Sequence, residues 1–124
     1  MSVKLKAAQV RGVRVSMLQK QGGKCALCGT PCSADQAVLD HDHSTGAVRA
    51  ALHRGCNSLL GKLENNAARY GVRDIGVFSN GVAQYLRIHS VNVSGYIHPL
   101  HKTDEEKRIA RNAKARKKRA ATKE

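Results

Sequence analysis

Four metal-ligand side chains at matched spacing constrain this chain more than any other feature of its sequence. Cys25 and Cys28 are separated by two residues, and His53 and Cys56 repeat that separation after 24 intervening residues. Three thiolates and one imidazole are an ordinary ligand set for tetrahedral structural zinc. Because four protein ligands leave no coordination position open, the predicted ion has a structural rather than a catalytic role.

The fourth ligand has an alternative in the same stretch. Cys32 lies four residues after Cys28 and could take the place of His53. We favour His53, because two pairs with the same spacer approach an ion symmetrically. Four buried cysteines without a metal would be the simpler interpretation, but unrelated core cysteines rarely fall at this spacing.

Size and composition support a metal staple. The chain has 124 residues, enough for one small core with extensions, and aromatic residues make up only 3% of it. A core with so few large side chains often needs a metal to be stable. The first sixteen residues, "MSVKLKAAQVRGVRVS", lack the apolar segment of a signal peptide. We therefore expect a cytoplasmic protein, where clustered cysteines favour metal over disulfide.

Apolar periodicity and turn residues predict a small α+β fold with a basic helix at its end. In "AVLDH" and "AVRAAL" we expect two strands, joined around "DHSTG" as a hairpin. The remaining predicted elements are a weak helix over 3–21, a helix from Asn57 to a stop at Gly71, a helical stretch over 78–89, and a helix over 104–120 that a Thr103/Glu106 capping box would start.

Charge is concentrated at the two ends of the chain. Residues 1–24 hold six Lys/Arg and no acid, residues 25–101 hold six against five, and residues 102–124 hold ten against four. We therefore divide the chain into a basic helical arm (1–24), a zinc-bound core with following helices (25–100) and a basic helical tail (101–124). Such a distribution favours nucleic acid over an anionic membrane, since neither arm carries a large apolar face.

The hairpin turn carries the residues best suited to catalysis. Asp40 and Asp42 alternate with His41 and His43, and Asn57 follows Cys56 at the start of the next predicted helix. A carboxylate and an amide oxygen suit Mg²⁺, which keeps waters and accepts phosphate oxygens as further ligands. A neutral imidazole beside it can take a proton from an attacking water. Asp42 is either a third ligand or a hairpin residue that orients a histidine, and we favour the second role.

These residues resemble a known family. The stretches "CALCG" and "LDHDHSTGAVRAALHRGCNSLLG", with the spacing between them, are similar to the phage recombination endonuclease VII family, a branch of the HNH (His-Me finger) nucleases. The resemblance covers about residues 17–63, and its combined motif is highly specific. It departs from the family pattern at His53, where a cysteine is usual. Zinc accepts either ligand.

The resemblance implies a fold, a reaction and a role for each site residue. The fold would be a ββα-metal core on a structural zinc. Asp40 and Asn57 would hold catalytic Mg²⁺ or Mn²⁺, His41 would be the general base, and His43 would contact and polarise the scissile phosphate. Family members cut DNA, so the expected partners are double-stranded or branched DNA and, as an option, a second copy of the chain in a homodimer. A phage-encoded protein would act in the host cytoplasm.

Two functions of different class follow from the sequence. One is a metal-dependent DNA endonuclease, and the other is a catalytically silent, zinc-stapled DNA-binding protein. We favour the enzyme, because a binding module has no need of Asp40, His41, His43 and Asn57 together. RNA as the substrate is a third option that the sequence leaves open.

Overall fold

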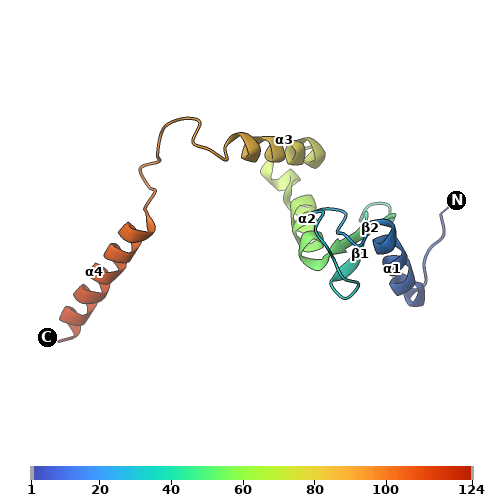
Figure 1. Ribbon diagram of the computed structural model, residues 1–124, viewed down its shortest axis with the longest axis horizontal. Coiled ribbons are helices and arrows are strands. Elements are labelled where there is room, and N and C mark those ends of the chain that lie inside the picture. Colours follow the sequence, from blue (N-terminus) through green and yellow to red (C-terminus); the bar gives the residue numbers. More distant parts are fainter. Residues whose placement is uncertain (1, 124) are drawn as a thin grey trace. The chain divides into compact units, whose positions relative to one another are not determined.

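The computed structural model describes residues 2–123 and has a small α+β fold. It consists of two units, one ending at Gly81 and one beginning at Val82, and each is described by itself. The first unit holds α1, the hairpin β1–β2 and α2, and the second holds the end of α3 and all of α4 (Figure 1).

A two-stranded antiparallel sheet forms the centre of the first unit. Strand β1 (Ala37–His41) pairs with β2 (Val48–His53), which confirms the predicted hairpin. Ala37 lies opposite His53, and the pairing runs in register as far as Asp40, which lies opposite Ala50. His41 then pairs with Val48, so Arg49 is left between the two pairs as a β-bulge.

Two helices flank this hairpin (Figure 1). Helix α1 (Val10–Lys20) packs on both strands, and α2 (Arg54–Asn66) also contacts both. At the end of α1, Gln21 fixes the helix to the free edge of β2. Its side chain accepts a hydrogen bond from the Ala51 N–H (2.9 Å) and donates one to the Ala51 carbonyl (2.8 Å). These two bonds satisfy backbone groups that an edge strand leaves unpaired.

The first helix begins later than the sequence predicted. Residues 2–6 are not helical, and a 3₁₀ turn over Ala7–Gln9 leads into α1. Gln9 accepts a hydrogen bond from the Lys6 backbone N–H (2.8 Å), as the second half of a capping box does. This bond caps the 3₁₀ turn, and α1 continues from it at Val10.

Helix α2 follows β2 without a linker and therefore begins at Arg54, three residues before the predicted start. A 3₁₀ turn over Ala68–Tyr70 continues it, and Gly71 ends it with φ +78°. This left-handed conformation confirms Gly71 as the predicted stop, because a side chain there would be strained.

The core of the first unit is small, as the composition indicated. Half-buried side chains of α1 and α2 cover its six buried residues, which are Leu18, Cys25, Cys32, Ala37, Ala51 and Leu52. Two of the six are cysteines and two are alanines, so little apolar area is removed from water.

Helix α3 (Ile75–Ile88) crosses the boundary between the units, and α4 (Asp104–Thr122) ends the described chain. The Thr103 hydroxyl accepts a hydrogen bond from the Glu106 N–H (3.1 Å), which confirms the predicted N-cap. Every described side chain of α4 is exposed. In the part of the chain that the structure describes, no helix combines the length and the apolar character needed to cross a membrane.

Candidate functional site

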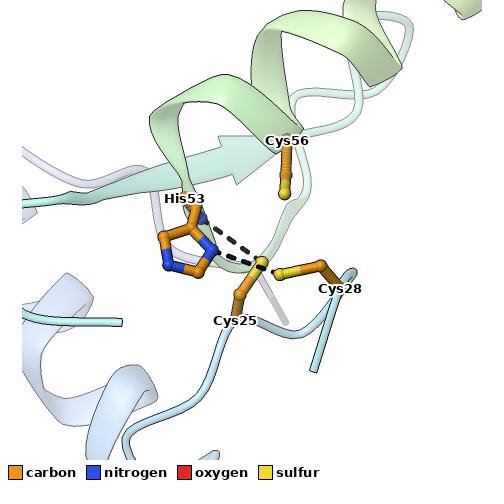
Figure 2. Close-up of side chains that lie close together, drawn as sticks. All are labelled: Cys25, Cys28, His53 and Cys56. Atoms are coloured by element: carbon orange, nitrogen blue, oxygen red, sulfur yellow. Dashed lines mark hydrogen bonds between the residues drawn. The ribbon is translucent and has the colours of Figure 1, made fainter. Parts of the chain in front are cut away.

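The four predicted zinc ligands converge at one end of the hairpin (Figure 2). Cys25 and Cys28 lie in the turn after α1, His53 ends β2, and Cys56 lies in the first turn of α2. Their ligand atoms all lie within 4.8 Å of one another. Three sulfurs and one imidazole nitrogen at this separation form a group that could hold zinc.

His53 is oriented by both of its ring nitrogens. Nε2 lies 3.0 Å from the Pro31 carbonyl oxygen, and Nδ1 lies 3.2 Å from Cys28 Sγ. A carbonyl oxygen can only accept a hydrogen bond, so we assign the ring proton to Nε2. The Nδ1 lone pair then faces the sulfurs. Metal-ligating histidines are commonly held by such a bond from their other nitrogen to a backbone carbonyl.

The surroundings of Cys25 favour its thiolate. Burial alone opposes ionisation, but hydrogen bonds from the backbone N–H groups of Cys28, His53 and Leu27 outweigh it and lower the pKa of Cys25 to about 6. Two of these N–H groups, those of His53 and Leu27, lie 3.3 and 3.4 Å from Cys25 Sγ. The thiolate is the form that binds zinc.

Cys56 behaves in the opposite way. Burial, and then the neighbouring Cys28 and Cys25, raise the pKa of Cys56 to about 11. Without a cation, ionisation of Cys56 is therefore opposed first by burial and then by its sulfur neighbours. A bound Zn²⁺ would remove this obstacle by neutralising them.

Cys32 lies outside the group. Its side chain is buried in the core, 5% exposed, and its thiol donates to the Ser33 carbonyl oxygen at 3.6 Å. Burial raises the pKa of Cys32. The structure thus gathers His53 rather than Cys32 with the other three ligands.

The two histidines of the hairpin turn lie side by side. The ring centroids of His41 and His43 are 4.9 Å apart, and both side chains are exposed. Between them, Asp42 Oδ1 accepts hydrogen bonds from the backbone N–H groups of Ser44 (2.8 Å) and Thr45 (3.0 Å). The Thr45 and Ser44 N–H groups lower the pKa of Asp42. The Asp42 carboxylate therefore holds the turn that carries the two imidazoles.

An open groove borders His41. Its volume is about 1060 Å³. Residues 2–5, side chains of α1 and three strand residues, Leu39, His41 and Val48, are among those that line it. An exposed imidazole on the wall of a groove is accessible to water and to a ligand.

Asp40 and Asn57 occupy different surroundings. Asn57 lies half-buried in the first turn of α2. Asp40 is 6% exposed and is the one buried charged side chain within residues 2–123. Arg49 binds both of its oxygens, with Nε 2.6 Å from Oδ2 and Nη2 3.2 Å from Oδ1.

Sequence reasoning did not identify Arg49, nor Glu64, which Arg49 also contacts. The Arg49 guanidinium donates to Glu64 Oε1 (3.0 Å) and Oε2 (3.2 Å). Hydrogen bonds to Asp40 first, and then to Glu64, raise the pKa of Arg49. One signal pointed to such a partner: an aspartate at a strand position that faces a helix needs a compensating charge when it is buried.

Comparison with known proteins identifies the family. The model of the family described as recombination endonuclease VII matches residues 3–87, which include α1, the hairpin, all four possible zinc ligands and α2. No curated protein matches this sequence. Since the matched region is more than half of the chain, this protein belongs to the recombination endonuclease VII family.

Proposed function

We propose that this protein is a metal-dependent DNA endonuclease that hydrolyses phosphodiester bonds through an HNH-type ββα-metal site. The observation that carries the proposal is the pair of exposed imidazoles, His41 and His43, on a hairpin that leads directly into α2. The family supports a nuclease acting on DNA. The Cys/His group could hold zinc, which would stabilise this small hairpin and helix.

In this proposal His41 is the general base. Its side chain is exposed at the end of β1 and borders the groove, where an attacking water can approach it. A neutral imidazole accepts a proton near neutral pH because its ordinary pKa is close to 6.5. His43, with its ring beside that of His41, would contact the scissile phosphate and polarise it.

Asp40 and Asn57 would hold the catalytic Mg²⁺ or Mn²⁺. A carboxylate and an amide oxygen are suitable donors for these ions. Arg49 uses one acceptor position on each Asp40 oxygen, and a carboxylate oxygen has two lone pairs, so each oxygen keeps one position for a cation. When bound, the ion supplies positive charge that stabilises the phosphate and the leaving oxygen.

The substrate in this proposal is double-stranded or branched DNA. The charge of the two ends of the chain supports a polyanionic substrate, since each end carries six more basic than acidic residues. Attack on a phosphodiester without recognition of the nucleobases would also cleave RNA. RNA is therefore offered as a second substrate in the test below.

A zinc-stapled DNA-binding protein without catalysis is the second candidate. One observation favours it: both oxygens of Asp40 are bonded to Arg49. In a protein without a catalytic cation, this ion pair would be purely structural.

The experiment that separates the two candidates is cleavage of supercoiled plasmid by zinc-loaded protein, with Mg²⁺ present or omitted. His41→Ala should reduce Mg²⁺-dependent cleavage by about 10²–10⁴-fold, because a general base acts only in the transition state. Zinc content, folding and DNA binding should stay unchanged. His89→Ala, at an exposed position after α3, is the matched control and should cleave like the wild type.

Two further variants sharpen this test. Asn57→Ala should weaken the metal site, so that higher Mg²⁺ partly restores the rate, whereas Mg²⁺ cannot replace a missing base. His43→Ala should lose rate and some DNA affinity. Wild-type cleavage by His41→Ala would show that His41 is not the base. If the wild type cleaves neither DNA nor RNA with Mg²⁺ or Mn²⁺, the binding protein is the correct function.

A further inference from the structure

Asp40, Arg49 and Glu64 form a chain of charges that links β1, the bulge in β2 and α2. One edge of the Arg49 guanidinium, Nε and Nη2, faces Asp40 at 2.6 and 3.2 Å. The other edge, Nη1 and Nη2, faces Glu64 at 3.2 and 3.0 Å. Four of the five N–H donors of Arg49 are therefore used, and the planar group is held on two sides.

The β-bulge explains how Arg49 reaches Asp40. Side chains of neighbouring residues in a strand point to opposite faces, and Ala50 is the residue paired with Asp40. In a regular ladder Arg49 would therefore point away from the Asp40 face. As the extra residue of a bulge it is re-aimed, and bulges often have this effect beside functional sites.

The three groups together carry one negative charge. Asp40 is 7% exposed as a side chain, whereas Arg49 and Glu64 are 34% and 27% exposed. A buried carboxylate with one neutralising partner would gain little from a cation. Here Glu64 takes up part of the Arg49 charge, so the Asp40 end keeps an attraction for positive charge.

We propose that Arg49 and Glu64 are positioning residues that hold the Asp40 carboxylate in the orientation in which it binds the catalytic cation. The proposal rests on the function proposed above. Glu64 fixes the guanidinium, and the guanidinium fixes both oxygens of Asp40. One lone pair on each oxygen would then be left for the cation. Hydrogen-bond partners of metal-ligating carboxylates commonly have this orienting role.

Binding of Mn²⁺ to zinc-loaded protein without DNA tests the proposal, measured by electron paramagnetic resonance and calorimetry well below the melting temperature. Mn²⁺ prefers the same oxygen ligands as Mg²⁺ and is directly detectable. Glu64→Gln removes the charge that fixes Arg49, and Arg49→Lys keeps the charge but cannot bind two carboxylates in one plane. Each should weaken Mn²⁺ binding by about 10-fold or more.

The chain offers matched controls in a second ion pair of the same residue types. Arg108 and Glu105 pair one turn apart on α4. Glu105→Gln and Arg108→Lys make the same chemical changes there and should leave the dissociation constant for Mn²⁺ unchanged. Because the Glu64 side chain is partly exposed and contacts Asp40 only through Arg49, Glu64→Gln should fold, which circular dichroism and zinc content verify.

Three outcomes would contradict the proposal that Arg49 and Glu64 position Asp40 for a cation. Unchanged Mn²⁺ affinity with a lower melting temperature would make Arg49 and Glu64 merely structural. Tighter Mn²⁺ binding would show that Arg49 competes with the cation for Asp40. If Asp40→Asn binds Mn²⁺ like the wild type, or if the wild type does not bind it, the proposed metal site itself is wrong, and this result is distinct from the first two.

Discussion

At the scale of single residues, His53 ends strand β2, belongs to the group of possible zinc ligands and contacts the loop at residue 31. Its backbone N–H donates to Cys25 Sγ, Nδ1 faces Cys28, and Nε2 contacts the Pro31 carbonyl. Histidine is compatible with this position because zinc accepts imidazole nitrogen and thiolate sulfur alike. The ring also connects the ligand turn to residue 31, which a cysteine side chain is too short to reach.

We predict that His53→Cys keeps one zinc per chain, whereas His53→Ala loses zinc to a chelator at a much lower concentration. The alanine variant leaves three ligands, and structural zinc contributes about 10 kcal/mol or more to such small folds. Metal analysis after a chelator titration measures both variants, with the melting temperature as a second readout.

Cys32→Ala is the matched control for this prediction. It removes a buried sulfur from the core but not from the ligand group. Zinc should remain, and stability should fall by about 1–3 kcal/mol because the core is packed less well. Loss of zinc from Cys32→Ala would contradict the assignment of His53 as the fourth ligand.

At the scale of elements, α4 depends on its first turn. Asp104, Glu105 and Glu106 lie in that turn, where acidic side chains interact favourably with the helix dipole, and Thr103 caps it. We predict that Thr103→Ala destabilises the helix by about 1 kcal/mol, because the Glu106 N–H loses its acceptor. Far-ultraviolet circular dichroism should show reduced helicity, most clearly at raised temperature.

Thr103→Ser tests the same bond with the hydroxyl retained. Serine caps at least as well as threonine, so its helicity should equal that of the wild type. Equal helicity in the alanine variant would mean that the cap does not limit this helix.

The same scale shows how far local patterns predict the fold. The hairpin, the Gly71 stop and the Thr103 cap are encoded within a few residues, so the sequence predicts them. The group of Cys25, Cys28, His53 and Cys56 is also predictable, because ligand spacing has few alternatives. The late start of α1 was not predicted, because the apolar pattern does not show the 3₁₀ turn that precedes it, in which the Gln9 side chain accepts a hydrogen bond from the Lys6 N–H.

The partners of Asp40 were beyond the reach of local reasoning. Arg49 faces Asp40 only because the strand pairing shifts by one residue, and strict alternation would place it on the other face. Glu64 is 15 residues further along the chain and meets Arg49 only once α2 has packed on the hairpin. Contacts of this kind depend on register and packing, which the sequence pattern does not specify.

At the scale of the whole molecule, the excess positive charge lies outside the stretch that holds the proposed catalytic residues. The stretch from Cys25 to His101 is nearly neutral, and the proposed catalytic residues lie within it. Residues 102–124 hold ten basic and four acidic side chains, and in α4 the described ones are all exposed. We therefore expect the tail to bind phosphate without contributing to the chemistry.

We predict that a chain ending at His101 binds DNA more weakly and with a flatter dependence on salt. For every phosphate that the shortened chain no longer neutralises, the slope of log K against log salt should fall by about 0.9, because fewer counterions are released on binding. Lys117→Gln with Lys118→Gln is a finer version: if both side chains bind phosphate, the slope should fall by about 1.8.

Fluorescence anisotropy at several salt concentrations measures the slope, and single-turnover cleavage at saturating DNA should change much less than affinity. An unchanged slope in the truncated chain would show that the tail does not bind DNA, and an equal decrease in single-turnover rate would show that it also positions the substrate for cleavage.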